Sequence, residues 1–308
     1  MTTSADSRMD EVLRWCASVL GPFEVAADHS REHPGLRATT RRLRTSAGFC
    51  YVKTYQDPTY WESEVHGYEQ WAPAFGEFTA RLLAVRAEQP LALVISALPG
   101  RVLEEVQLSA SQEKAVWRTA GRALAALHSL ETGECFGPCH RDGTCVGQPI
   151  FDAREYVTQD LESWLERGNR AGYLSEDELA IIQTASDLIP AFEGEHPLPC
   201  HRDYCPANWL VSDDGAWAGV LDFEFAYWDV RVADFTRYPD WDWISHPERV
   251  EALFEGYGRS FTPAEEQQRL VGHAQYALSA IVWGMENAYY GFAQEGRLAL
   301  RRLGELLG

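Results

Sequence analysis

The chain has 308 residues, enough for one large domain or two lobes around a sizeable core. An apolar content of 45% is ordinary for a folded globular protein and excludes a disordered chain. The formal net charge of -19 argues against general nucleic-acid binding, because a phosphate backbone demands a basic surface. The same charge suits a cationic small molecule as partner, although it equally fits a role in solubility.

The sequence has no feature of a membrane or secreted protein. No apolar run approaches the roughly 20 residues of a membrane-spanning helix, and the N-terminus lacks a basic segment followed by an apolar stretch. We therefore expect a cytoplasmic protein, and seven cysteines, an odd number, fit a reducing compartment. The segment 135–145 (CFGPCHRDGTC) lacks the paired ligand spacing of structural zinc, so we expect a loop with free thiols.

The first third of the chain is predicted to be rich in strands. Apolar residues recur at helical spacing over 7–20, and strand-like patterns follow from about 23 to 55, with a hairpin turn at 46–48. A helix over about 59–72 and two strands, near 78–86 and 91–96, come next. Leu98-Pro99-Gly100 then breaks the pattern.

Helices dominate the rest of the chain. Two capping boxes, Ser109 with Gln112 and Ser175 with Glu178, predict helices through 130 and over 176–192. The other expected elements are helices at 153–167, 247–257, 263–289 and 292–307 and strands around 209–211 and 217–222. This order predicts a two-lobed α+β enzyme, with a β-rich N-terminal lobe at 1–97, a helical C-terminal lobe at 98–308, and a ligand cleft.

The tripeptide His-Arg-Asp occurs at 140–142 and at 201–203, so the tripeptide alone decides nothing. The first copy has Gly147 five residues past its Asp, whereas the second has Asn208 at that distance. Only the second leads on, fourteen residues after Asn208, to Asp222 in GVLDFEF. This pattern indicates phosphoryl transfer, in which one carboxylate orients a hydroxyl nucleophile while an amide and a second carboxylate hold Mg²⁺ on a nucleoside triphosphate.

The second copy therefore supplies the candidate catalytic site. Asp203 is the expected general base or hydroxyl-orienting group, because it is ionised at neutral pH. Asn208 and Asp222 offer the hard oxygen ligands that Mg²⁺ takes.

A cation in the β-rich part is the expected anchor for the nucleotide. Lys53, in the strand FCYVKTY, is predicted to hold the α- and β-phosphates of ATP or GTP, and Glu64 to fix its rotamer. We choose Glu64 because Glu62 and Glu69 fit solvated helix positions. A lone Lys beside apolar residues is otherwise usually a snorkelling surface residue.

Together these segments resemble the aminoglycoside phosphotransferase and choline kinase-like family, relatives of the protein kinases. The matching pieces are YVK at 51–53, ESEVHGYEQW at 62–71, AGRALAALHSL at 120–130, CHRDYCPANWLV at 200–211 and GVLDFEFAYWDVRVADF at 219–235. They span most of the chain from about residue 36 to 235, and the last seventy residues match only as a helical tail.

The resemblance implies a protein-kinase-like fold and a role for each matched residue. Lys53 and Glu64 would form the ATP-anchoring pair, and the hinge beside adenine would consist of Ser96, Ala97 and Leu98. Asp203 would be the catalytic residue, with the magnesium ligands Asn208 and Asp222. Asp234, in the segment that resembles the family's D-L-A signature, would brace the catalytic loop from below.

The sequence departs from the family pattern in three places. Arg202 stands between the His and the catalytic Asp, where most members have a small residue. The expected phosphate-covering turn, at 39–46, lacks G-x-G-x-x-G, and Asp222-Phe223-Glu224 replaces D-F-G. Glu224 is therefore a candidate contact for the metal or the substrate.

The phosphate acceptor is expected to be a small cationic molecule, since no A-P-E segment for peptide docking follows Asp222. The region instead contains carboxylates and aromatic residues: Asp229, Asp240, Trp241, Asp242, Trp243, Glu248, Glu286, Tyr289 and Tyr290. Carboxylates pair with ammonium groups and indole faces attract cations. We therefore expect an aminoglycoside or a basic cyclic peptide antibiotic, with candidate contacts at Glu224, Asp229, Asp240, Asp242 and Glu286. The alternative is that the tryptophans are core residues and the acids are solvated.

Two other functions stay open. One is a metabolic kinase of the same fold that acts on choline, an amino sugar or homoserine; the other is a nucleotide-binding pseudokinase, which the intact Lys53 and Asp203 disfavour. A hydrolase built on Cys200 and His201 is excluded, because adjacent residues on an extended segment point to opposite faces. The sequence carries no signal for the oligomeric state.

Overall fold

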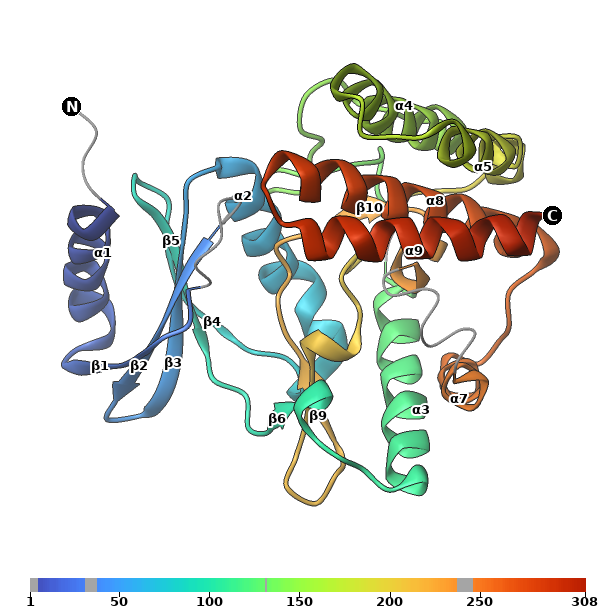
Figure 1. The fold of residues 1–308 in the computed structure, drawn as a ribbon. Helices are drawn as coiled ribbons and strands as arrows, with labels where there is room; N and C mark the ends of the chain where they lie inside the picture. Colours follow the sequence, from blue (N-terminus) through green and yellow to red (C-terminus); the bar gives the residue numbers. More distant parts are fainter. Residues whose placement is uncertain (1–4, 31–37, 131, 237–245) are drawn as a thin grey trace.

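The computed structural model describes residues 5–30, 38–130, 132–236 and 246–308. Figure 1 shows an antiparallel sheet with helix α1 (Ala5–Leu20) on its outer face and a larger helical part on its other side. Strand β5 ends at Ser96, and the first long helix after it begins at Ala110. The division of the chain into two lobes at 97–98 stays a prediction.

Five antiparallel strands form the N-terminal sheet in the order β1-β2-β3-β5-β4. Their bounds are β1 Phe23–Asp28, β2 Ala38–Thr45, β3 Gly48–Tyr55, β4 Leu82–Arg86 and β5 Leu91–Ser96. Val12 and Cys16 of α1 pack with Val52 of β3 in a buried cluster on the outer face. Because side chains alternate along a strand, Lys53 points to the opposite face, toward the helical part.

Helix α2 (Pro58–His66) lies on that opposite face, where the indole of Trp61 donates to the carbonyl of Ala92 in β5 at 3.1 Å. The α-helix does not continue to residue 72 as expected. It widens into a π-helical turn over Gly67–Trp71, and a 3₁₀ segment over Ala72–Phe78 follows. A Cβ on Gly67 would lie 3.0 Å from the Cβ of Phe223, so glycine lets this turn approach the site closely.

Helices form most of the C-terminal part. They are α3 (Ala110–Leu127), α4 (Ala153–Ala171), α5 (Glu176–Ser186), α7 (Pro247–Tyr257), α8 (Pro263–Glu286) and α9 (Tyr290–Leu307). Both predicted capping boxes are present, at Ser109 and Ser175. Helices α4, α5, α8 and α9 share one buried core, while α3 lies beside α7 (Figure 1). The prediction for 176–192 was too long, since a 3₁₀ turn at Ile189–Phe192 follows α5.

Two small sheets carry the segments of the site. β6 (Arg101–Val102), β8 (Trp209–Val211) and β9 (Trp217–Val220) form one, and β7 (Leu198–Cys200) pairs with β10 (Tyr227–Asp229) in the other. β8 and β9 match the prediction. The other three were missed because they have two or three residues and pair with strands distant in the sequence, whereas a short turn joins β8 to β9.

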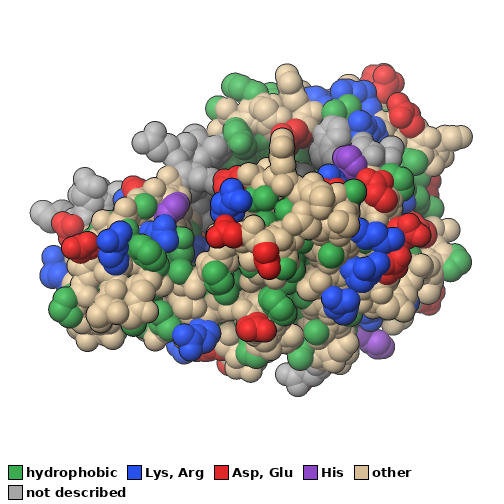
Figure 2. Space-filling model, turned by 90° about the horizontal axis from the view of Figure 1, so that it is seen from below, with side chains coloured by type: hydrophobic (Ala, Val, Ile, Leu, Met, Phe, Trp, Pro, Cys, Tyr) green, Lys and Arg blue, Asp and Glu red, His purple; other side chains and the backbone are tan. Residues whose placement is uncertain are grey.

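The surface of the molecule mixes charges of both signs. Figure 2 shows acidic and basic side chains interspersed on one face. Among the residues that the structure describes, no helix combines the length and the apolar character that a membrane crossing needs.

Cys135 and Cys145 form a disulfide, with their Cα atoms 6.3 Å apart. The expectation of free thiols in this loop is therefore wrong for these two residues, whereas Cys139 between them is free and buried. The sequence could not reveal this pair, because cysteine connectivity depends on the path of the folded chain.

The crossing of α3 and α7 depends on a glycine. A Cβ on Gly121 would lie 2.0 Å from the carbonyl oxygen of Leu253. We expect Gly121→Ala to lower the free energy of unfolding by about 2–3 kcal/mol, because the two helices would have to separate. Urea unfolding measures the change. Gly291→Ala in α9 is the control, since nothing lies within 4 Å of a Cβ there. A free energy of unfolding of Gly121→Ala equal to that of wild type would contradict the close approach.

Candidate functional site

Lys53 lies at the centre of the candidate site. Its Nζ donates to both carboxylate oxygens of Glu64 at 2.8 Å and to Oδ1 of Asp222 at 2.8 Å. Oε2 of Glu224 lies 3.7 Å from the same Nζ. The predicted pairing of Lys53 with Glu64 is thus formed. Through Glu64 and Asp222, Lys53 joins the sheet to α2 and to the segment after β9.

Burial and charge together set the protonation of this cluster. Lys53 is 7% exposed and Glu64 is 0% exposed. Burial alone lowers the pKa of Lys53, but the carboxylates of Asp222 and Glu64 outweigh burial and raise this pKa well above its usual value. Burial raises the pKa of Asp222, yet Lys53 reverses the effect and holds that pKa below its usual value. Lys53 is therefore a cation and Asp222 an anion at neutral pH.

Asp203 and Asn208 form the second half of the site. Nδ2 of Asn208 donates to Oδ2 of Asp203 at 2.8 Å and to the Asp203 carbonyl at 3.0 Å. The N–H of Leu221 donates to the carbonyl of Asn208 at 2.9 Å, and the next residue is Asp222. A continuous chain of contacts therefore links Asp203 to Lys53.

A divalent cation fits the carboxylate side of this network. Oxygen atoms of Glu64, Asp222 and Glu224 lie within 4.8 Å of one another. Because Nδ2 of Asn208 is engaged with Asp203, its Oδ1 is the atom that suits a hard cation. These donors match the preference of Mg²⁺, and the assignment of Asn208 and Asp222 as its ligands stays a prediction.

Asp234 braces the loop that precedes Asp203, in the position that the family resemblance implied. Its carboxylate accepts the N–H of His201 at 3.0 Å and the N–H of Arg202 at 2.5 Å. Nε2 of His201 donates to the carbonyl of Leu221 at 2.9 Å, so the loop is also tied to the segment of Asp222.

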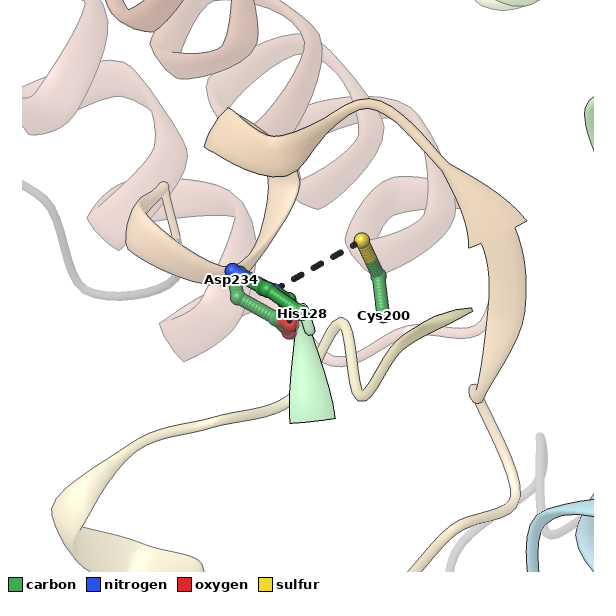
Figure 3. A group of neighbouring side chains, drawn as sticks. All are labelled: His128, Cys200 and Asp234. Atoms are coloured by element: carbon green, nitrogen blue, oxygen red, sulfur yellow. Dashed lines mark hydrogen bonds and ion pairs between the residues drawn. The ribbon is translucent and has the colours of Figure 1, made fainter. Parts of the chain in front are cut away.

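Figure 3 shows His128, Cys200 and Asp234 as a buried group of potential metal ligands. Their donor atoms serve other contacts: Nε2 of His128 lies 2.9 Å from Asp234, and its Nδ1 lies 2.9 Å from the hydroxyl of Tyr257. Burial raises the pKa of Cys200 well above its usual value, so the thiol stays protonated. Through Asp234 this group supports the loop of His201 and Arg202.

Two site residues have a left-handed backbone, Arg202 with φ 62° and Asp222 with φ 69°. Non-glycine residues adopt this conformation at a cost of about 1–3 kcal/mol each, and such residues cluster at functional sites. Between these segments lies the buried ring of Phe223, 4.8 Å from the His201 ring and 5.0 Å from that of Tyr68. The aromatic contacts hold both strained turns in register.

The side chain of Arg202 is held by Asp229. The Nε–Oδ2 distance is 2.7 Å, and the guanidinium lies 4.6 Å from the centre of the Tyr227 ring. Asp229 is 4% exposed and also accepts from the hydroxyl of Tyr156 at 3.1 Å. Its carboxylate is thus engaged by protein groups, and its predicted contact with an acceptor stays a prediction.

The predicted hinge follows β5 directly. The N–H of Ser96 donates to the carbonyl of Arg81 at 2.9 Å, and the N–H of Ala97 donates to that of Phe49 at 3.1 Å. Leu98 comes next and is half-buried. The position of these three residues beside adenine stays a prediction.

The expectation of a phosphate-covering turn at 39–46 is wrong. Those residues belong mainly to strand β2, in which Thr40 pairs with Lys53 and Thr45 pairs with Gly48. The tight turn after Thr45 therefore lies at the end of the hairpin that is remote from Lys53. The sequence offered no glycine signature that would have corrected the placement.

Other predicted residues lie apart from this network or outside it. Glu286 forms an ion pair with Arg167 between α8 and α4, and its role stays a prediction. Asp240 and Asp242 lie outside the described residues.

Glu62 and Glu69, which we expected at solvated helix positions, are partly exposed, and each contacts a basic residue. Glu62 pairs with His140 and Glu69 with Arg141, two residues of the first His-Arg-Asp copy. Partners more than 70 residues apart in sequence leave no local signal, so the prediction could not have found them.

Residues 31–269 match the profile of the phosphotransferase enzyme family. The chain belongs to this family. A homoserine kinase of Phenylobacterium zucineum (strain HLK1) is 29% identical over 178 residues, which are 56% of this chain and 47% of that protein. The chain thus matches about half the length of this relative.

Solved structures share the fold of this phosphotransferase at low identity. Aminoglycoside phosphotransferase APH(4)-Ia, solved with ADP and hygromycin B, has a TM-score of 0.70 at 14% identity, covering 95% of this chain and 97% of that one. An APH(2") phosphotransferase with GDP and kanamycin has a TM-score of 0.71 at 9% identity, covering 96% and 98%. The predicted protein-kinase-like α+β fold is confirmed, and family membership confirms the predicted enzyme class.

The titration of Asp229 gives a test of the geometry. Burial raises the pKa of this carboxyl from 3.8 to about 6. The folded protein therefore holds the proton more tightly than the unfolded chain, so this contribution to stability is present at low pH and is lost as the pH rises through about 6.

As the pH falls from about 7 to about 5, we expect the free energy of unfolding of wild type to rise by about 1 kcal/mol relative to that of Asp229→Asn. Urea unfolding of both proteins at each pH measures this difference, and titrating groups that do not interact with Asp229 cancel. A difference that does not change with pH would contradict the raised pKa.

Proposed function

We propose that this phosphotransferase moves the γ-phosphoryl group of ATP or GTP to a hydroxyl of a small cationic molecule. The supporting observation is the unbroken network from Lys53 through Asp222 to Asp203. It brings a cation for phosphates, donors for Mg²⁺ and a carboxylate for a hydroxyl into contact, and phosphoryl transfer requires this combination.

Each residue would act mainly by positioning. Lys53 binds the α- and β-phosphates, and Glu64 holds its ammonium in place. Mg²⁺, held by Asn208 and Asp222, would neutralise charge on the transferring group. Asp203 accepts a hydrogen bond from the acceptor hydroxyl and takes its proton as the new O–P bond forms and the bond to the leaving phosphate oxygen breaks.

Charge supports a cationic acceptor. A net charge of -19 raises the local concentration of cations around the protein. Two proteins with the same fold were solved with the aminoglycosides hygromycin B and kanamycin. An aminoglycoside or basic peptide antibiotic is therefore our first candidate, with resistance by O-phosphorylation as its consequence.

An alcohol that resembles an amino acid is the second candidate. The Arg202 side chain is 28% exposed and directly precedes Asp203, so its guanidinium suits a carboxylate on the acceptor. The similarity to a homoserine kinase over 178 residues agrees with this candidate.

A panel assay tests the proposal. The purified protein is incubated with Mg-ATP or Mg-GTP and with aminoglycosides, basic cyclic peptides, choline, amino sugars or homoserine, and products are identified by mass spectrometry. We expect a cationic antibiotic to gain one phosphoryl group. Product on homoserine alone would establish the second candidate, whereas no product and no nucleotide hydrolysis would favour a pseudokinase.

In that assay Asp203→Ala should reduce transfer by about 10²–10⁴-fold, because the hydroxyl loses its base. Nucleotide binding should stay close to the wild-type level. Asp213→Ala is the control, since Asp213 is exposed in the turn between β8 and β9. Transfer at the wild-type rate in Asp203→Ala would remove this residue from its role.

Asp222→Ala should abolish the increase in nucleotide affinity that Mg²⁺ provides, because the variant lacks one carboxylate ligand. Calorimetric titration with ADP, with and without Mg²⁺, measures this increase. An unchanged increase would place the metal ligand elsewhere.

A further inference from the structure

A loop of the helical part docks on the helix that carries Glu64. This segment, the 135–145 loop, contains the first His-Arg-Asp copy, which the proposed chemistry does not use. Oγ of Ser63 donates to the carbonyl of Cys139 at 3.2 Å, and Nδ1 of His66 donates to that of Arg141 at 3.1 Å. Both donors are buried in the interface.

Two side-chain contacts extend this docking. Arg141 donates to both carboxylate oxygens of Glu69, at 3.0 Å from Nε and 2.6 Å from Nη2. Nδ1 of His140 pairs with Glu62. A bidentate guanidinium–carboxylate pair fixes orientation as well as distance, so the loop holds a defined register on the helix.

The far side of the 135–145 loop is fixed to the site itself. The indole of Trp228 in β10 donates to the carbonyl of Gly143 at 3.1 Å, and Gly137 donates its N–H to the carbonyl of Trp228 at 2.8 Å. The disulfide between Cys135 and Cys145 closes the loop. The loop therefore connects β10, which also carries Asp229, with the helix of Glu64.

The spacing of the contacts explains what the loop does. Glu62, His66 and Glu69 are four and three residues apart and lie on one side of the helix, while Glu64 points to Lys53. The contacts also span the junction at His66, where α2 gives way to the π-helical turn. A π-helical turn is rare and interrupts the regular i→i+4 bonding of an α-helix, so the loop contacts the helix at the point where its backbone changes.

We infer that the 135–145 loop is a positioning element that holds Glu64 against Lys53 and thereby sets the affinity for the nucleotide. The inference rests on the proposed function, because it requires that Lys53 binds phosphates. Trp61 anchors the other side of α2 to the sheet, so loss of the loop contacts loosens the helix without unfolding it.

The test is a binding titration of the full chain with a fluorescent ATP analogue, mant-ATP, in the presence of Mg²⁺. His140→Ala/Arg141→Ala removes both side-chain contacts and should raise Kd about fivefold, since each contact is partly exposed and of modest strength. Arg170→Ala is the matched control, because Arg170 forms an ion pair with Glu166 on α4 that is remote from α2. Its Kd should equal that of wild type.

Rescue separates positioning from general destabilisation. Arg141→Glu alone faces Glu69 with a like charge and should weaken binding, and adding Glu69→Arg should restore it. A wild-type Kd in the folded His140→Ala/Arg141→Ala variant, or a failed rescue in a folded double variant, would overturn the inference. Failure of the proposed function would give a different result: mant-ATP would bind Lys53→Ala with the same Kd as wild type.

Closure of the loop is tested with a dithiol reductant. The reductant gives two electrons and two protons to the Cys135–Cys145 bond, yielding two thiols and an oxidised, cyclic reductant. We expect reduction to raise the Kd of wild type. Cys135→Ser/Cys145→Ser, which lacks the disulfide, should have this raised Kd with or without reductant. An unchanged Kd in wild type, after thiol counting has verified reduction, would exclude a role for the disulfide in positioning.

Discussion

One buried ammonium group among carboxylates organises this protein. Removing a charge from water costs several kcal/mol, so Lys53 is stable in this position only because Glu64 and Asp222 each contact it at 2.8 Å. These partners are 11 and 169 residues away in the sequence, so the cation couples the folding of the sheet, α2 and the segment after β9. With Glu224 and all groups ionised, the cluster has a formal charge of 1 - 3 = -2, which a divalent cation would neutralise.

Charged side chains also fix the backbone around Asp203 and Asp222. Arg202 and Asp222 are held in a left-handed conformation. The carboxylate of Asp234 accepts the backbone N–H of Arg202, and Lys53 donates to the carboxylate of Asp222. Groups that are locked before substrate arrives need little reorganisation during the reaction. The buried His128 beneath Asp234 extends this rigidity into α3.

Local patterns carried most of the prediction, and contacts distant in sequence account for what was missed. Helix periods, capping boxes and the spacing of Asp203, Asn208 and Asp222 are short-range features, so the sequence located them within a few residues. The disulfide of Cys135, the pairing of β7 with β10 and the partners of Glu62 depend on chain segments that only the fold brings together. The π-helical turn at Gly67–Trp71 was missed for a related reason: the packing of Phe223 against Gly67 favours it, and helical periodicity cannot reveal that contact.

Two of the carboxylates that the sequence predicted as acceptor contacts are compensated within the protein. Asp229 faces Arg202, and Glu286 faces Arg167, so these two carboxylates do not form an acidic patch. Attraction of cations then depends on the net charge of -19. The field of this charge speeds the association of a cationic molecule with the protein, and added salt weakens the field. Arg202 directly precedes Asp203 in the sequence, and its guanidinium, although paired with Asp229, is 28% exposed. An acceptor with both an ammonium and a carboxylate group would satisfy the long-range attraction and the local guanidinium together, which is the physical reason to test homoserine-like alcohols beside antibiotics.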